Sequence, residues 1–213
     1  MSNIILPLQS KYLESFRYKV DPLILEMEEY AEKNNVPILH WHSAEFMEQL
    51  IRIYQPKRVL EIGTAIAYTT IRIAKNLNLK SVIHTIEISK NNIKTAEKNI
   101  DKSKMGKKIK IIEGDALRIM QQLEKKYDFI FLDADKEDYK RLFDYSMLLL
   151  RKGGVIVVDN LLWHGYAASS KVPLKYRKST KHIRDFNKVF IAQKNLHSII
   201  IPVGDGLGIG VKK

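Results

Sequence analysis

Four apolar segments of this sequence end in or near an acidic residue, and these acids are the first candidates for chemistry: Glu61, Glu87, Asp115 and Asp133. Glu87 lies 24 positions after Gly63. A carboxylate about 20 residues beyond a glycine turn can accept hydrogen bonds from both hydroxyls of a ribose. Each acid alone is more commonly an exposed loop carboxylate, but four of them at one edge of a sheet would form a binding site.

The stretch KRVLEIGTAIAYTT, residues 57–70, changes from a strand pattern to a helical pattern at Gly63. Such a turn places backbone N–H groups and a helix N-terminus where ligands bind in open parallel sheets, although an ordinary strand-to-helix turn explains it equally well. A pyrophosphate-binding G-x-G-x-x-G is poorly matched, because Ala65 and Tyr68 stand where its later glycines belong. The nearby acids would repel phosphate and attract a cation. The sequence therefore favours S-adenosylmethionine, which carries a sulfonium but no phosphate, over NAD.

A second group of polar residues ends two later apolar segments. Asp133 closes FIFLD, while Asp159 and Asn160 close VIVVDN. Two carboxylates and an amide oxygen suit magnesium or another hard divalent ion, although Asp159-Asn160 also fits a simple strand-terminating turn. Lys136 follows Asp133 by three residues, at the expected start of a helix. A lysine beside a dication can have a lowered pKa and act as a general base, although a surface lysine is commoner.

The elements that must position these residues alternate between strand and helix patterns after Pro56. A helical N-terminal segment, residues 1–55, precedes them, with Asp21-Pro22 opening a helix over Leu23–Asn34 and Ser43 as the cap of a helix over Ala44–Tyr54. The expected strands are Arg58–Ile62, Ser81–Glu87, Lys108–Glu113, Phe129–Leu132, Gly154–Asp159, Ser198–Pro202 and Leu207–Val211. The expected helices are Tyr68–Asn76, Lys90–Ser103, Ala116–Glu124, Lys136–Leu149 and Ser179–Ala192. This order predicts one α/β domain over residues 1–213, a doubly wound and mostly parallel sheet with an antiparallel C-terminal hairpin.

Composition narrows the function classes. The 213 residues are 45% hydrophobic and 28% charged, and contain no cysteine, which excludes disulfides, thiolate catalysis and cysteine-bound metals. No apolar run reaches the about 18 residues of a membrane span. The N-terminus lacks the pattern of a signal peptide, so we expect a cytoplasmic protein without a membrane partner.

The formal charge of +12 suggests a polyanionic partner. Two stretches carry most of it: residues 99–110 have a net charge of +4, and residues 166–188 have a net charge of +6. Stretches of this kind are usually only solvated faces, so the charge alone weighs little.

Together these motifs resemble the metal-dependent S-adenosylmethionine O-methyltransferases, the class I family that contains catechol and caffeoyl-CoA methyltransferases. The resemblance covers about residues 36–213 and is carried by VPIL, RVLEIGTAIAYTT, TIEIS, GDA, FIFLDADKEDY, GGVIVVDNLLWHG and IPVGDGLGIGVKK. It implies a Rossmann-like, seven-stranded sheet of strand order 3-2-1-4-5-7-6.

Position by position, the resemblance also implies roles for single residues. The cofactor would be bound by Ile38, Glu61, Gly63, Tyr68, Thr69, Glu87, Asp115, Ala116 and Asp133; the metal by Asp133, Asp159 and Asn160; and Lys136 would be the catalytic base. Two departures stand out. Ala67 replaces the glycine that the family has before the tyrosine, and His40-Trp41-His42 replaces an acidic-proline segment.

Within the family, the resemblance is greatest to the bacterial enzymes that methylate 5-hydroxyuridine at the wobble position of tRNA. It implies tRNA as a partner, contacted through its anticodon region by residues 99–110 and 166–188, and a homodimer. The basic stretch 166–188 with Tyr166 and Tyr176 agrees, since phosphate contacts and stacking aromatics suit a flipped base. The alternatives are an O-methyltransferase of a small phenol, and an RNA-binding protein that keeps the fold without catalysis.

Overall fold

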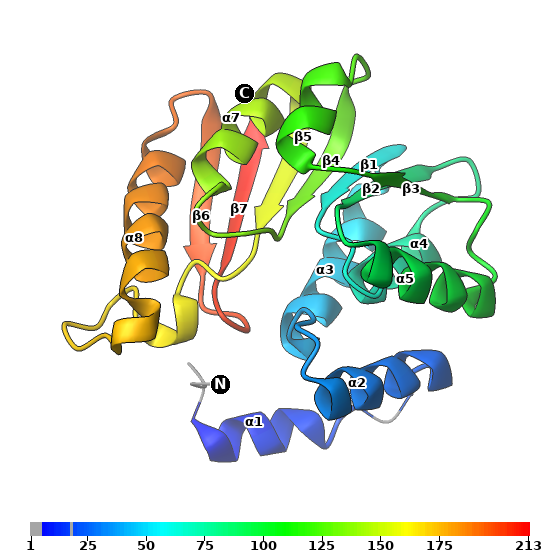
Figure 1. The fold of residues 1–213 in the computed structure, drawn as a ribbon, viewed down its shortest axis with the longest axis horizontal. Helices are drawn as coiled ribbons and strands as arrows, with labels where there is room; N and C mark the ends of the chain where they lie inside the picture. Colours follow the sequence, from blue (N-terminus) through cyan, green and yellow to red (C-terminus); the bar gives the residue numbers. More distant parts are fainter. Residues whose placement is uncertain (1–5, 18) are drawn as a thin grey trace.

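The computed structural model of the protein describes residues 6–17 and 19–213. Within these residues, seven strands form one sheet in the order β3-β2-β1-β4-β5-β7-β6 (Figure 1). The strands are β1 (Arg58–Ile62), β2 (Val82–Glu87), β3 (Ile109–Glu113), β4 (Tyr127–Leu132), β5 (Leu150–Val158), β6 (Leu196–Ile201) and β7 (Leu207–Lys212). The first five pair in parallel, and β7 pairs antiparallel with both β5 and β6. The predicted fold and strand order are confirmed.

The helices cover both faces of this sheet. They are α1 (Pro7–Glu14), α2 (Pro22–Asn34), α3 (Trp41–Tyr54), α4 (Tyr68–Asn76), α5 (Lys90–Ser103), α6 (Ala116–Ile119), α7 (Tyr139–Leu149) and α8 (Arg177–Ala192). Alternate strand residues serve two cores: Val59 packs with α3, α4 and α5, and Leu60 packs with α7 and α8. Central strands buried on both faces are the usual state of a parallel sheet.

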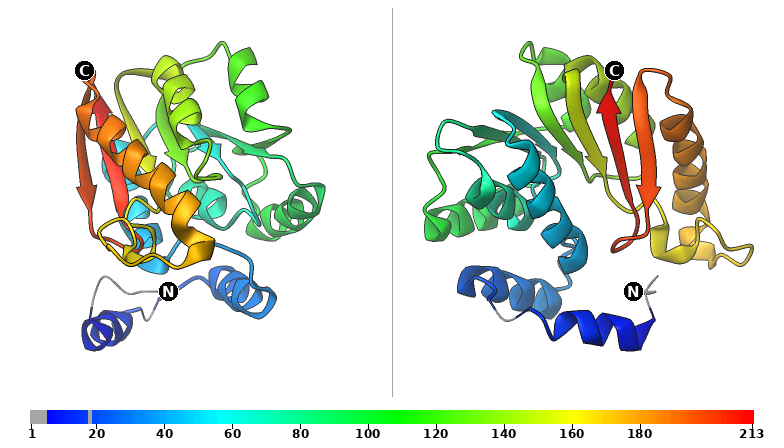
Figure 2. Two further views of the ribbon diagram at one scale, coloured as in Figure 1. Left: turned by 60° about the vertical axis from the view of Figure 1, so that its left-hand side comes forward. Right: turned by 180° about the vertical axis from the view of Figure 1, so that it is seen from behind.

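Because the first five strands run in parallel, their carboxyl ends all lie at one edge of the sheet. Helices α1 and α2 lie across this edge, and so does the segment that joins β5 to α8 (Figure 1, Figure 2). Helix α1 buries no side chain, so a role of residues 1–55 as a lid or dimer contact stays a prediction. Among the described residues, no helix is long and apolar enough to cross a membrane.

Several predicted boundaries were wrong: β5 begins at Leu150 and not at Gly154, α8 begins at Arg177 and not at Ser179, and three further helix ends also differ. Helix α3 begins at Trp41 with His40 as its cap, because His40 Nδ1 accepts from His42 N at 3.3 Å, while the predicted cap Ser43 donates to Val203 O. Helix α7 begins at Tyr139, so Lys136 lies in the turn before it. Helix α6 ends at Ile119 and continues only as a 3-10 turn to Gln122.

Candidate active site

Gly63 ends β1 at the centre of the edge where the predicted site lies. Its φ is +100°, and a Cβ at this position would lie 1.9 Å from the carbonyl oxygen of Asp133. Asp133 N donates to Ile62 O at 3.0 Å, so β1 and β4 stay in contact past their paired residues. Only glycine accepts both the positive φ and this approach. The predicted cofactor turn and a predicted metal ligand are thereby in direct backbone contact.

Glu61 lies completely buried two residues before that turn. Its Oε2 accepts hydrogen bonds from the hydroxyls of Thr70 and Thr85, the latter at 2.6 Å. Its Oε1 has no hydrogen-bond partner among the residues that the structure describes. Burial raises the pKa of Glu61 to about 7, despite the two threonine hydroxyls that lower it. A buried acceptor with an unused oxygen suits a cationic or N–H donor ligand.

Glu87, the predicted ribose ligand, holds the glycine turn in place. Its Oε2 accepts from Ala65 N at 2.8 Å, and its Oε1 accepts from the backbone N–H groups of Ile88 and Ser89 at 2.9 and 2.8 Å. A carboxylate has about four lone-pair sites. Three are used here, which leaves about one for a ribose hydroxyl.

Asp115, the predicted adenine ligand, also has a local structural role. Its Oδ1 accepts from Leu117 N at 2.8 Å and caps α6, whose first residue is Ala116. Asp115 and Ala116 follow β3, and Glu87 ends the neighbouring β2. The structure thus brings these three residues to the same edge as Gly63.

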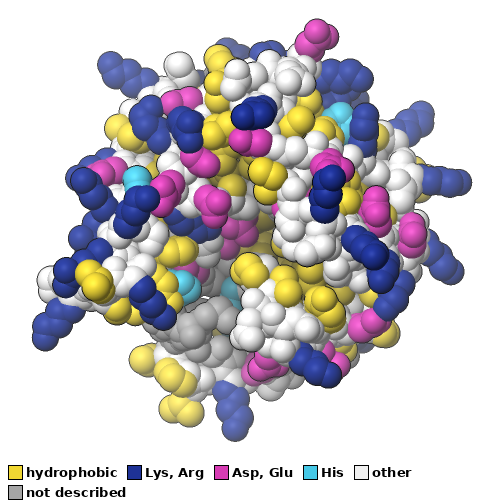
Figure 3. Space-filling view, in the orientation of Figure 1, with side chains coloured by type: hydrophobic (Ala, Val, Ile, Leu, Met, Phe, Trp, Pro, Cys, Tyr) yellow, Lys and Arg dark blue, Asp and Glu magenta, His cyan; other side chains and the backbone are white. Residues whose placement is uncertain are grey.

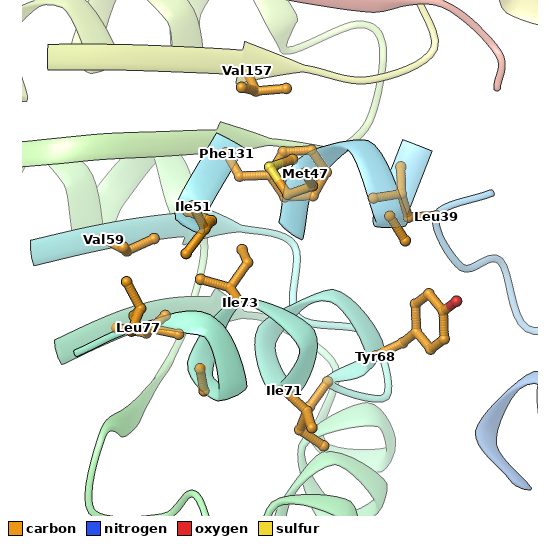
Figure 4. Close-up of a cluster of buried hydrophobic side chains, with 14 of the residues drawn as sticks. Leu39, Met47, Ile51, Val59, Tyr68, Ile71, Ile73, Leu77, Phe131 and Val157 are labelled. Carbon is orange, nitrogen blue, oxygen red and sulfur yellow. The ribbon is translucent and has the colours of Figure 1, made fainter. Parts of the chain in front are cut away.

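Three other predicted cofactor residues surround the start of α4. Tyr68 is buried, and its hydroxyl donates to Glu28 Oε1 at 2.5 Å; Figure 4 shows this hydroxyl directed away from the other labelled core side chains. Thr69 is buried beside it, and Ile38 packs partly buried against the same core. Ala67 has φ +66°, so the chain keeps at this position the left-handed conformation that favours glycine.

Lys136 contacts Asp133 directly and is connected to the residue after β5 through Tyr139. Its Nζ lies 3.1 Å from Asp133 Oδ1 and donates to the hydroxyl of Tyr139 at 2.7 Å. The Tyr139 hydroxyl in turn donates to the carbonyl oxygen of Asp159 at 3.1 Å. Burial lowers the pKa of Lys136, but Tyr139, Asp133 and Asp159 together raise it above its ordinary value. Lys136 is therefore protonated in this arrangement and held by the Asp133 carboxylate and the Tyr139 hydroxyl.

Asp159 and Asn160 lie at the end of β5, next to Lys136. Asp159 is buried, and its Oδ1 has no hydrogen-bond partner within the described chain. Burial and the nearby charge of Asp133 raise its pKa. Asn160 Nδ2 donates to Asp205 Oδ2 at 3.2 Å, which leaves the amide oxygen as a ligand atom. In residues 6–17 and 19–213, no three His, Cys, Asp or Glu side chains gather as metal ligands, so the predicted set depends on the amide.

Comparison with known proteins agrees with this geometry. A family model described as O-methyltransferase matches residues 16–213. Caffeoyl-CoA O-methyltransferase 2 of Petunia hybrida is 33% identical over 85% of this chain and 80% of the relative, and caffeoyl-CoA O-methyltransferase 1 of Arabidopsis thaliana is 33% identical over 92% and 81%. The chain belongs to this O-methyltransferase family. The predicted O-methyltransferase family is confirmed, while its metal dependence and the tRNA acceptor stay predictions.

Solved structures of related O-methyltransferases have the same fold. A Staphylococcus aureus protein assigned as a caffeoyl-CoA O-methyltransferase is 32% identical, with a TM-score of 0.90 over 97% of this chain and all of the other. An O-methyltransferase of Bacillus cereus in complex with SAH is 26% identical, with a TM-score of 0.84 over 97% of both chains. The similarity therefore extends over the complete sheet and its helices.

Sequence reasoning missed two residues of this O-methyltransferase site. Tyr139 joins Lys136 to Asp159, and Asp205 holds the amide nitrogen of Asn160 and accepts from His164 N at 2.5 Å. Asp205 lies in the turn between β6 and β7, which reaches this edge because β7 runs antiparallel beside β5. The Gly-Asp-Gly sequence of that hairpin turn was the feature of the sequence that could have indicated Asp205 as a site residue.

The loop after Asn160 is strained and aromatic. Asn160, Trp163 and His164 all have positive φ values, of 61°, 46° and 55°. Strained backbone of this kind gathers at functional sites. The ring of Trp163 lies 5.6 Å from Lys136 Nζ, so the strain places an aromatic face beside the predicted base.

Proposed function

We propose that this O-methyltransferase transfers the methyl group of S-adenosylmethionine to the 5-hydroxyl of a wobble 5-hydroxyuridine in tRNA, with the help of a divalent cation. The observation that carries the proposal is the double contact of Asp133. Its backbone closes on Gly63 of the cofactor turn, and its side chain lies against Lys136. A methyl donor on one side of Asp133 and an acceptor hydroxyl on the other would therefore be neighbours, and positioning of this kind supplies much of the acceleration of a transfer reaction.

The residues around Gly63 fit S-adenosylmethionine, which supplies a methyl group on a positively charged sulfur. The unused, buried Oε1 of Glu61 suits the amino group of its methionine part. Glu87 keeps a site for a ribose hydroxyl, and Asp115-Ala116 lies at the next strand end. The Bacillus cereus relative was solved with SAH, in agreement with this assignment.

The residues around Lys136 fit a divalent cation such as Mg²⁺, which Asp133, Asp159 and Asn160 would hold. Oxygen ligands of this type suit hard cations, and Asp159 Oδ1 is a buried oxygen without a partner in the described chain. When bound, the cation supplies positive charge that lowers the pKa of an acceptor hydroxyl and offsets the carboxylate charge that raises the pKa of Lys136. Lys136 Nζ, fixed by the Tyr139 hydroxyl, would first lose its own proton to solvent and would then, as the neutral amine, take the acceptor proton.

The acceptor is assigned from the charge and the aromatic rings beside this site. Residues 166–188 continue from the strained loop after Asn160 and include Tyr166 and Tyr176, whose rings stack at 5.2 Å. The stretch 99–110 lies at the opposite edge of the sheet from the reaction site, because it runs from the end of α5 into the first residues of β3. Lys108 in this stretch donates to carbonyl oxygens at the end of α4. The tRNA assignment therefore depends on residues 166–188.

A small phenolic acceptor is the second candidate, and the names of the plant relatives favour it. Such an enzyme would use the same Asp133, Lys136 and Asp159. Salt separates the two candidates, because activity on tRNA would fall steeply with salt while activity on an uncharged diphenol would not.

The test is methyl transfer by the purified protein to unmethylated tRNA that carries 5-hydroxyuridine, with mass analysis of the wobble nucleoside. Lys136→Ala should abolish product formation while cofactor binding persists. Lys140→Ala is the matched control, since Lys140 is exposed and pairs only with Asp144 among the described residues, and it should retain activity. Full turnover by Lys136→Ala would refute the role of the base. Turnover of a diphenol but not of tRNA by the wild type would favour the second candidate.

A further inference from the structure

A hollow of about 830 Å³ lies between α8 and the segment before it, and cationic side chains line it. Arg177, Lys181, Arg184 and Lys188 come from α8, and Lys171 comes from the opposite wall. The four α8 residues recur at steps of four, three and four positions, which places them along one face of the helix for about 16 Å. Asp185 is the one acidic residue of the lining. Figure 3 shows Lys and Arg side chains projecting on the left flank, over α8.

Arg184 connects the two walls of this hollow through hydrogen bonds. Its guanidinium donates to the carbonyl oxygens of Ala167 and Tyr166 at 3.0 and 2.9 Å, and also to that of Ser169. Arg184 thereby fixes the segment that follows the strained loop against α8. Because the guanidinium N–H groups of Arg184 already donate to backbone carbonyl oxygens, other cationic side chains would have to bind a ligand.

Arg177 donates through Nε to the carbonyl oxygen of Val172 at 3.3 Å, so Lys171 and Lys181 are the lining cations left entirely available to a ligand. Both are exposed, and neither side chain has an ion-pair or hydrogen-bond partner in the part of the chain that the structure describes. Lys188 approaches Asp185 only at 3.9 Å. By contrast, Lys178 on the other side of α8 pairs with Glu137 at 2.7 Å. Unpaired cations facing one another across a hollow form a site of positive potential for an anionic ligand.

The hollow is joined to the reaction site by aromatic rings. Tyr166 lines the hollow and stacks on Tyr176, whose ring lies 6.2 Å from that of Trp163. Trp163 in turn lies 5.6 Å from Lys136 Nζ. A series of neighbouring aromatic rings thus runs from the predicted base to the cationic hollow, with Tyr166 and Tyr176 stacked and Trp163 edge-on to Tyr176. Stacked bases next to a groove of backbone-binding cations are the arrangement by which proteins bind single-stranded nucleic acid.

We infer that this hollow, with Lys171 and Lys181 as its main contacts, binds the phosphates of a single-stranded RNA loop, while Trp163, Tyr166 and Tyr176 receive its unstacked bases. The inference deepens the proposed tRNA function and depends on it. The phosphates lie on one side of the aromatic rings and Lys136 lies on the other, so a loop bound in this way would present one base to the reaction site.

The test is binding of a fluorescent anticodon stem-loop that carries 5-hydroxyuridine, measured by anisotropy over a range of salt concentrations. Lys171→Glu/Lys181→Glu should weaken binding at least 10-fold and reduce the salt slope by about one for each lysine. Lys80→Glu/Lys125→Glu is the matched control, because it makes the same change in net charge on exposed residues that precede the amino ends of β2 and β4, away from the hollow. Binding by the control should stay within about twofold of the wild type. Unchanged thermal melting and cofactor affinity would show that each variant is folded.

The outcomes separate the inference from the proposed function. Equal losses in the two double variants would overturn the inference, since general charge and not the hollow would then attract RNA. So would binding of coenzyme A, but not of the stem-loop, in a way that depends on Lys171 and Lys181. Failure of the wild type to methylate a stem-loop that it binds through the hollow would refute the proposed function alone and support the hollow as an RNA site.

Discussion

Replacing Gly63 with alanine tests the close contact between the cofactor turn and Asp133. The new Cβ would lie 1.9 Å from the Asp133 carbonyl oxygen, whereas a carbon and a carbonyl oxygen approach to about 3.3 Å. The ends of β1 and β4 would have to separate by more than an ångström. Overpacking of this kind costs about 1–3 kcal/mol, and the positive φ adds about 1–2 kcal/mol. We expect Gly63→Ala to lose about 2–5 kcal/mol of unfolding free energy in urea denaturation.

Gly153→Ala is the matched control for Gly63→Ala. Gly153 also has a positive φ, of +72°, but a Cβ there would meet nothing within 4 Å. This variant should lose only the conformational part, about 1–2 kcal/mol. In Gly63→Ala, the affinity for S-adenosylmethionine should also fall, because the shift moves Asp133. Equal losses of stability in the two variants, with unchanged cofactor affinity, would refute the argument from close approach.

Three other changes test single groups of the site. Burial raises the pKa of Glu61 from its ordinary 4.5 to about 7, so the folded protein retains this proton more tightly than the unfolded chain does. The unfolding free energy of the wild type should therefore fall as the pH rises from about 4.5 to 7, and Glu61→Gln should remove about 3 kcal/mol of that fall in urea denaturation at a series of pH values. Identical pH profiles of the two proteins would contradict the shift. Tyr68→Phe should lower the unfolding free energy by about 1–2 kcal/mol, because Glu28 loses its short hydrogen bond from the tyrosine hydroxyl. Its cofactor affinity, measured by calorimetry, should change little, and a large loss of affinity would show that the hydroxyl reaches the cofactor. Asp205→Ala should weaken Mg²⁺ binding about 10- to 100-fold in calorimetric titration by freeing the amide of Asn160, and an unchanged affinity would exclude this positioning role.

The sequence predicted the parts of the site that local pattern determines. Gly63 is recognisable because a strand pattern changes to a helical pattern there, and Glu61, Glu87 and Asp133 because they end apolar segments. Parallel strands place such ends at one edge, so their proximity followed from topology. The seven-stranded order came from the family resemblance and was confirmed.

Local pattern could not show how these residues share hydrogen bonds. The bond from Ala65 N to Glu87 forms only when the glycine turn folds over the end of β2. Asp205 reaches Asn160 across 45 positions of the chain. The helical spacing predicted α7 from Lys136, but the contacts of Lys136 with Asp133 and Tyr139 keep it in the turn before the helix. Contacts across 22 and 45 positions decided the first two details, and side-chain contacts three residues apart decided the third, and neither kind is recorded in a hydrophobic pattern.

The most direct measurement of the central claim is methyl transfer by metal-stripped protein with 5-hydroxyuridine-containing tRNA, in the presence of chelator or of added Mg²⁺, for the wild type and Asp159→Asn. The account predicts 5-methoxyuridine in the wild-type reaction with Mg²⁺, little product in chelator, and no recovery by Mg²⁺ in Asp159→Asn. This variant should still fold and melt cooperatively, because Asn has nearly the same shape as Asp and Asp159 Oδ1 accepts no hydrogen bond among the described residues. Equal product with and without Mg²⁺, or full activity of Asp159→Asn in chelator, would contradict the account.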